Sequence, residues 1–217
     1  MCIICVSGRG VRQPSESEIR EMFYRNPHGA GYMVAEGGKV RIEKGFMHLS
    51  ELLRALKWER FGDDDVVVYH FRISTQAGVN PEMTQPFPLT TDIEKMKYTT
   101  VTSCPCGVAH NGIIAMTSDK NEHEYSDTAL YISKYLSAHV RRPEHLRDEH
   151  VLEEVQREIE SKMVLLDGSG DYAIIGHFIE DDGLLFSNTS YKPWRWEGLS
   201  KKWGGFSGKW SKWDEWD

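Results

Sequence analysis

The second residue, Cys2, is the position in this sequence best suited to covalent chemistry. The initiator methionine is normally removed when a small residue follows it, and loss of Met1 would leave a thiol and a free α-amine on one residue. The ordinary pKa of an α-amine is about 7.7–8.0 and that of a cysteine thiol about 8.5, so the pair is close to proton balance at neutral pH. An amine beside the thiol can act as its base, directly or through one water. We therefore predict that Cys2 is a nucleophile.

The residues that follow Cys2 favour a rigid support for it. Ile3, Ile4 and Val6 form an apolar, β-branched run that is typical of a buried strand. A strand holds a reacting group more firmly than a loop does. A single early cysteine is more often an ordinary residue than a nucleophile, so this interpretation depends on what accompanies it.

Further motifs follow Cys2 in a fixed order along the chain. They are His70–Thr75, Gln85–Phe87, Ala109–Ile114, Ser126–Thr128 and Gly170–Ile174. Together with Cys2 they resemble the glutaminase domain of class II glutamine amidotransferases, which belongs to the N-terminal-nucleophile hydrolases. That domain occurs in glutamine phosphoribosylpyrophosphate amidotransferase, glucosamine-phosphate synthase and asparagine synthetase. Each motif is weak alone, and the resemblance rests on the ordered set, which spans residues 2–195.

The resemblance implies a pocket for glutamine. Arg72 matches the family arginine that binds the α-carboxylate, a task for which the planar guanidinium is suited because it forms two parallel hydrogen bonds. Asp127 matches the family aspartate that meets the α-ammonium group, and Thr75 matches a threonine that supports the same pocket.

The resemblance also implies an amidohydrolase mechanism. The Cys2 thiolate attacks the side-chain amide of glutamine, ammonia leaves, and water releases glutamate from a γ-glutamyl thioester. Asn111 (side-chain NH₂) and Gly112 (backbone N–H) match the family oxyanion hole, where loss of one donor typically costs about 2.7–4 kcal/mol of barrier. This mechanism needs no cofactor and no metal ion.

Each of these positions also has a simpler interpretation. Asn111-Gly112 alone is more often a hairpin turn, Asp127 alone fits the start of a helix, and Arg72 alone fits a surface ion pair. None of these alternatives explains the ordered set. Cys104-Pro105-Cys106 is too closely spaced for the usual zinc pair, so we expect no metal site there.

Composition limits the class of protein. The chain has 217 residues, a formal net charge of −7 and 40% hydrophobic residues, which fits a folded domain and argues against general affinity for nucleic acid. No apolar run approaches the roughly 18 residues of a membrane span. We see no secretory signal and therefore expect a cytoplasmic protein.

The periodicity of apolar residues predicts an α+β protein. We expect a four-layer αββα sandwich of two mainly antiparallel sheets flanked by helices, which is the fold that the resemblance implies. Ser15 or Ser17 is expected to cap a helix that buries Ile19, Met22 and Phe23. Further helices are expected over 49–56, from about 126 and over 148–163. Strands are expected at 2–6, 32–35, 40–43, 66–71, 98–103 and 107–110. A final hairpin is expected to join strands over 171–180 and 184–187.

Two departures from the family pattern bear on function. Arg25–Gly31 has Asn26 and His28 where glycine and aspartate are usual, which affects the support of the substrate loop. The residues 196–217 form a Trp-rich tail, for which docking to a partner and strapping over the protein's own surface are both open.

The leading hypothesis is a glutaminase that passes ammonia to a separately encoded synthase, docked through this tail. A stand-alone hydrolase of another γ-glutamyl amide and a non-catalytic binding or regulatory subunit are the alternatives.

Overall fold

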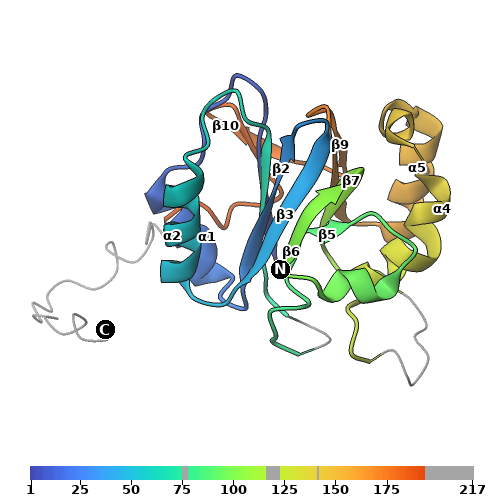
Figure 1. The fold of residues 1–217 in the computed structure, drawn as a ribbon, viewed down its shortest axis with the longest axis horizontal. Coiled ribbons are helices and arrows are strands. Elements are labelled where there is room, and N and C mark those ends of the chain that lie inside the picture. Colours follow the sequence, from blue (N-terminus) through green and yellow to red (C-terminus); the bar gives the residue numbers. More distant parts are fainter. Residues whose placement is uncertain (75–77, 116–122, 141, 194–217) are drawn as a thin grey trace, which may run out of the picture.

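The described residues form two antiparallel sheets that lie face to face, with helices outside both (Figure 1). The structure is a computed structural model, and it describes residues 1–74, 78–115, 123–140 and 142–193. The larger sheet contains β1 (Ile3–Ser7), β2 (Ala30–Glu36), β3 (Lys39–Phe46), β4 (Val67–Phe71), β6 (Thr100–Cys104), β10 (Ile179–Asp181) and β11 (Leu184–Phe186), and the smaller contains β5 (Phe87–Pro88), β7 (Cys106–Asn111), β8 (Lys162–Asp167) and β9 (Tyr172–Ile175). Their strand orders are β10-β11-β1-β4-β2-β3-β6 and β5-β7-β8-β9. The predicted α+β class with two antiparallel sheets is confirmed.

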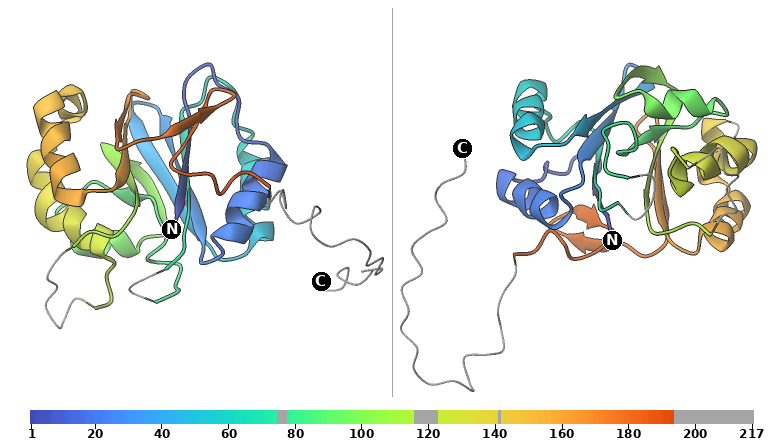
Figure 2. Two further views of the ribbon diagram at one scale, coloured as in Figure 1. Left: turned by 180° about the vertical axis from the view of Figure 1, so that it is seen from behind. Right: turned by 90° about the horizontal axis from the view of Figure 1, so that it is seen from below.

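Helices cover the outer face of each sheet. One side carries α1 (Glu16–Arg25) and α2 (Leu49–Glu59), and the other carries α3 (Asp127–Tyr131), a π-helical turn (Ile132–Leu136), α4 (Ser137–His139) and α5 (Glu149–Ile159). Short 3₁₀ turns lie at Ile93–Lys97 and Pro143–Arg147. The view from below in Figure 2 separates the two groups of helices, with the strands between them. None of the described helices has the length and apolar character needed to cross a membrane.

The alternation of strand side chains divides the core into layers. In β1, Ile3 and Cys5 pack toward α1 and α2, whereas Ile4 and Val6 pack between the two sheets. Successive side chains of a strand point to opposite faces, so β1 contributes to both core layers. This strand begins at Ile3, directly after the nucleophile predicted from the sequence.

Helix α1 begins where its capping residue predicts. The Ser15 side chain accepts the Glu18 backbone N–H at 3.3 Å, and the Glu18 carboxylate accepts the Ser15 backbone N–H at 2.7 Å. This reciprocal capping box satisfies N–H groups that have no partner within the helix. Ile19, Met22 and Phe23 are buried, as predicted.

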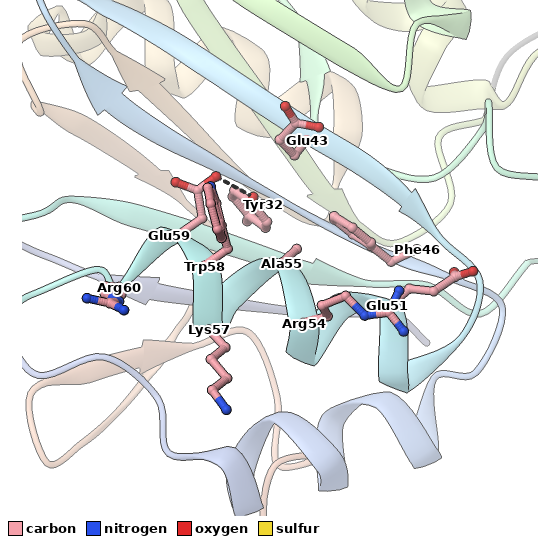
Figure 3. Close-up of a pocket in the computed structure, with 10 residues that line it drawn as sticks. All are labelled: Tyr32, Glu43, Phe46, Glu51, Arg54, Ala55, Lys57, Trp58, Glu59 and Arg60. Carbon is pink, nitrogen blue, oxygen red and sulfur yellow. Dashed lines mark hydrogen bonds between the residues drawn. The ribbon is translucent and has the colours of Figure 1, made fainter. Parts of the chain in front are cut away.

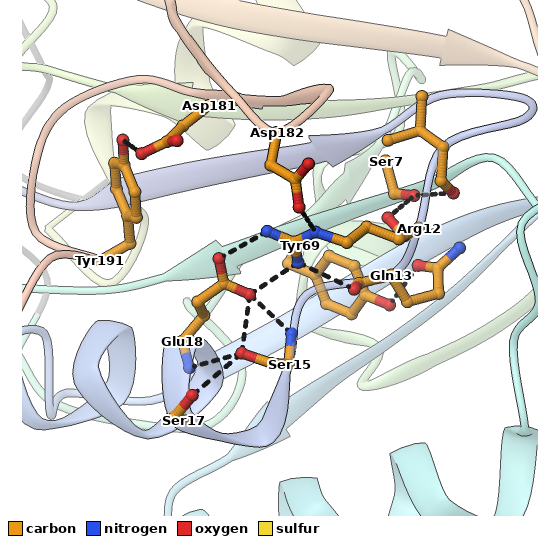
Figure 4. A network of polar contacts seen from close by, with 11 residues as sticks. Ser7, Arg12, Gln13, Ser15, Ser17, Glu18, Tyr69, Asp181, Asp182 and Tyr191 are labelled. Carbon is orange, nitrogen blue, oxygen red and sulfur yellow. Dashed lines mark hydrogen bonds and ion pairs between the residues drawn. The ribbon is translucent and has the colours of Figure 1, made fainter.

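Arg12 ties the start of α1 to the far edge of the larger sheet (Figure 4). Its guanidinium donates to both oxygens of Glu18, at 2.8 and 2.9 Å, and also to Asp182 in the turn between β10 and β11. A planar guanidinium matches a carboxylate in this two-bonded geometry. The contact connects segments that lie 170 residues apart in the chain.

The predicted helix over 148–163 is wrong in its last four residues. Helix α5 ends at Ile159, because Glu160 adopts a left-handed conformation (φ 46°) and its N–H bonds the Gln156 carbonyl. Met163, assigned to the buried face of that helix, lies in strand β8. Strand β8 lies between β7 and β9 and is buried on both faces, so it lacks the alternation by which we recognised other strands.

The predicted long strand over 171–180 is also wrong. It divides at Gly176, whose φ is 86°, into β9 of the smaller sheet and β10 of the larger one. A Cβ at Gly176 would lie 2.7 Å from the Ser161 carbonyl oxygen, so the chain turns there only with glycine. The hairpin that does form joins β10 and β11 across Asp182-Gly183.

Candidate active site

Cys2 lies just before β1, against the backbone that follows β4. Its Sγ lies 3.4 Å from the Ile73 nitrogen and 3.5 Å from the Ile73 oxygen. Burial raises the pKa of the Cys2 thiol, while the hydrogen bond from Ile73, the Met1 amine and the charge of Arg72 oppose that rise. The Met1 residue is 83% exposed. The thiol thus lies against the Ile73 backbone, and Met1 is accessible from solvent.

The charges of Arg72 and Asp127 interact, although Arg72 directly follows strand β4 and Asp127 begins helix α3 on the other side of the molecule's core. Arg72 is 4% exposed, and its Nη1 donates to the Gly78 carbonyl at 2.9 Å. Burial lowers the pKa of Arg72, and the charges of Cys2 and Asp127 oppose this. Asp127 Oδ2 accepts the Ile114 backbone N–H at 2.8 Å. The charge of Arg72 thus interacts both with the Asp127 carboxylate and with the Cys2 thiol.

The residue His28 holds the segment that carries Arg72. The His28 backbone N–H donates to the Arg72 carbonyl at 2.9 Å, and its Nδ1 accepts the Ser74 N–H at 2.9 Å. His28 stands where aspartate is usual in the family that the sequence resembles. Its backbone and imidazole nevertheless hold the segment that follows β4. The Arg25 Nε lies 3.6 Å from the Glu21 carboxylate within α1.

Asn111 ends strand β7 and reaches the larger sheet through a serine. Its Nδ2 lies 2.9 Å from the Ser187 Oγ, and that oxygen also accepts the Ile4 backbone N–H at 2.8 Å. The next residue, Asn188, donates from its Nδ2 to the Cys2 carbonyl at 2.6 Å. Asn111 is thereby connected by hydrogen bonds to the strand that begins beside Cys2.

Gly112 occupies a position with no room for a side chain. An added Cβ would lie 2.4 Å from the Ser161 Cβ and 3.2 Å from the His110 Nε2. Ser161 and His110 are themselves joined, since the Ser161 Oγ lies 2.7 Å from that nitrogen. The Cα of Gly112 is consequently packed close against this pair.

A buried polar network bridges the two sheets behind the candidate site. The His70 Nε2–H donates to the His110 carbonyl at 3.1 Å, and the His110 Nδ1 lies 2.9 Å from the Thr128 Oγ1. The Gln85 Oε1 accepts the His110 backbone N–H at 2.7 Å. Burial lowers the pKa of His70 to about 3. It also lowers that of His110 to about 4, against the opposing charge of Asp127. Both imidazoles are therefore neutral at pH 7.

Lys44 anchors the loop that carries Gln85. Burial lowers the pKa of Lys44, with the charge of Arg72 acting in the same direction. Its Nζ also lies 4.0 Å from the centre of the Phe87 ring. The Nζ donates to the carbonyl oxygens of Glu82, Thr84 and Met96 at 2.6, 3.0 and 2.6 Å. These bonds favour the ammonium form and fix the loop against β3.

The charge of Arg72 interacts with those of Cys2 and Asp127. Asn111, which Gly112 follows directly, connects through Ser187 to the strand that follows Cys2. The roles predicted for these residues stay predictions. Thr75 lies outside the described residues, as does the predicted tail over 196–217. The sequence analysis missed Ser187, Asn188 and Lys44. A polar Ser-Asn pair after a buried strand was the available signal for the first two.

The groove drawn in Figure 3 lies elsewhere. It has a volume of about 1000 Å³, lies between α2 and β3, and is lined in part by Tyr32, Phe46 and Trp58. None of the predicted site residues lines it. In the part of the chain that the structure describes, no group of three or more His, Cys, Asp or Glu residues could hold a metal ion.

Comparisons with known proteins give no family for this chain. No family model matches it, and no curated protein matches its sequence. The functional argument therefore rests on the sequence pattern and the geometry above.

Proposed function

We propose that this chain is an N-terminal cysteine amidohydrolase that releases ammonia from the side-chain amide of glutamine, with the fold and mechanism of a class II glutamine amidotransferase domain. One observation carries the proposal. The thiol of Cys2 lies against Ile73, next to Arg72, at the end of the strand that Ser187 links to Asn111. These contacts support the assignment of Cys2 as the nucleophile, Arg72 as the carboxylate-binding cation and Asn111 as the oxyanion donor.

The reaction begins once Met1 is removed and Cys2 carries a free amine. The amine takes the thiol proton, and the sulfur attacks the amide carbon of glutamine. The negative charge that develops on the amide oxygen is stabilised by Asn111 and the Gly112 N–H. The C–N bond then breaks, the amine returns the proton to the departing nitrogen as ammonia leaves, and a γ-glutamyl thioester remains on Cys2.

Water completes the cycle. The Cys2 amine removes a proton from the water as it adds to the thioester carbon, and the C–S bond breaks to give glutamate and the free thiol. Arg72 binds the α-carboxylate of the substrate and Asp127 its α-ammonium group. This division of roles is supported by the charge interaction of Arg72 with both Asp127 and the Cys2 thiol.

The ammonia acceptor is part of the same proposal. A separately encoded synthase would receive the ammonia, with residues 196–217 as the docking segment, and this assignment stays a prediction because those residues lie outside the described ones.

Intact mass after incubation with 6-diazo-5-oxo-norleucine, a glutamine analogue that alkylates such nucleophiles, tests the proposal. We expect a mass that lacks Met1 and carries one adduct on Cys2, and loss of glutamine hydrolysis in Cys2→Ala. Cys5→Ala is the matched control, because Cys5 lies in β1, the strand that follows Cys2, and packs toward the helices. Unchanged hydrolysis by Cys2→Ala, or an adduct elsewhere, would refute the mechanism.

A further inference from the structure

The side-chain amide of Asn111 is incompletely bonded in a buried position. The residue is 4% exposed, and its Nδ2 lies 2.9 Å from the Ser187 Oγ. Its Oδ1 is buried and has no hydrogen-bond partner among the described residues. Buried polar atoms are nearly always bonded, so an unpartnered one calls for a physical explanation.

Within the described part of the chain, the hydroxyl group of Ser187 lacks an acceptor for its proton. Its Oγ already accepts the Ile4 backbone N–H at 2.8 Å, and the Asn111 Nδ2 brings a second N–H to the same oxygen. A serine hydroxyl has two acceptor positions and one proton. Both contacts use the acceptor positions and neither uses the proton, while the Asn111 oxygen lacks a donor.

A half-turn of the amide about its terminal bond gives the Ser187 proton an acceptor and the amide oxygen a donor, and it moves the unpartnered position to the NH₂ group. The nitrogen and oxygen of an amide are nearly alike in shape, and which one faces a given partner is settled by the hydrogen bonds they make. With Oδ1 toward Ser187, the hydroxyl proton is donated to it at the same separation, and the Ile4 N–H still binds the hydroxyl oxygen. The NH₂ group then faces away from Ser187 with both of its protons available.

We propose that Ser187 is a positioning residue that holds Asn111 with its oxygen toward β11 and its NH₂ group toward the substrate. This inference rests on the proposed function and adds to it a residue outside the set that the sequence pattern indicated. The NH₂ group then has a proton to donate to a negatively charged oxygen, such as the one that forms when sulfur attacks an amide.

The position of Ser187 suits this task. Its backbone N–H donates to the Ile4 carbonyl at 2.9 Å, and its Oγ accepts the N–H of the same residue, so it is fixed from both sides to the strand that begins beside Cys2. It is fully buried, which excludes water as a competitor for the hydroxyl proton. The orientation of Asn111 is therefore set relative to the nucleophile's own strand.

Kinetics of Ser187→Ala test the role. We expect kcat for glutamine hydrolysis to fall about 10- to 100-fold, because one oxyanion donor is misdirected, with KM within twofold of the parent. Ser187→Thr keeps the hydroxyl and should recover much of kcat. Ser7→Ala is the matched control, since Ser7 is an equally buried serine whose hydroxyl donates to the Val11 and Arg12 carbonyls rather than to Asn111. A kcat within twofold of the parent for Ser187→Ala, or equal losses in both alanine variants, would overturn the role.

Neutron diffraction from deuterated crystals of the full chain decides the amide orientation without any assay. We expect the deuteron of Ser187 between its Oγ and the Asn111 oxygen, and two deuterons on the far atom of the amide. Deuterons on the amide atom nearest Ser187 would refute the inference. If the parent protein does not hydrolyse glutamine, the proposed function fails, while the neutron map still decides the orientation.

Discussion

The two buried histidines should make the protein sensitive to mild acid. His70 and His110 are neutral in the folded protein, with pKa values of about 3 and 4 produced by burial, against 6.5 for an ordinary histidine. As the pH falls below 6.5, the unfolded chain binds a proton at each site that the folded chain does not. Stability from these groups is therefore complete above pH 6.5 and is lost as the pH falls toward 4 and 3. Between pH 8 and pH 5, linkage gives a loss of about 2 kcal/mol for each histidine, or about 4 kcal/mol together.

Urea unfolding at pH 8 and pH 5 measures this loss. Acidic residues also titrate over this range, so the comparison is between variants rather than between pH values alone. His70→Gln keeps an N–H donor for the His110 carbonyl but cannot bind a proton. It should lose about 2 kcal/mol less than the parent between the two pH values. His177→Gln removes an exposed imidazole and serves as the control. An identical pH-dependent loss in His70→Gln and the parent would refute the reasoning.

Two further predictions concern packing and the loop behind the site. Gly112→Ala places a Cβ 2.4 Å from the Ser161 Cβ. It should destabilise the protein by about 1–3 kcal/mol in urea unfolding. Adding Ser161→Gly should restore part of that stability, and no recovery in the double variant would contradict the assigned clash. Lys44→Met leaves the carbonyl oxygens of the loop without their donor, and we expect a loss of about 3 kcal/mol or more in the same measurement. Lys57→Met, at an exposed lysine of α2, is the control, and a Lys44→Met loss as small as the control's would contradict the anchoring role.

Local sequence signals predicted the elements whose physical causes are local. The cap at Ser15, the apolar face of α1 and the turn between β2 and β3 depend on residues within one or two turns of each other. Strand β8 was not predicted from local signals. A strand buried on both faces has no alternation of apolar and polar residues, and its apolar run continues the helical spacing of the segment before it. The break at Gly176 was missed because the two halves of that segment pair with different sheets.

The sequence by itself determined which side chains are capable of the chemistry: a thiol at Cys2, a guanidinium at Arg72, an amide at Asn111 and a carboxylate at Asp127. Only the tertiary structure decided how they are held. Ser187 contacts Ile4 across 183 residues of chain, and this contact exists because β11 pairs with β1. Hydrogen-bond partners at such separations follow from which strands lie side by side, a result of packing the whole core, and no local pattern encodes it.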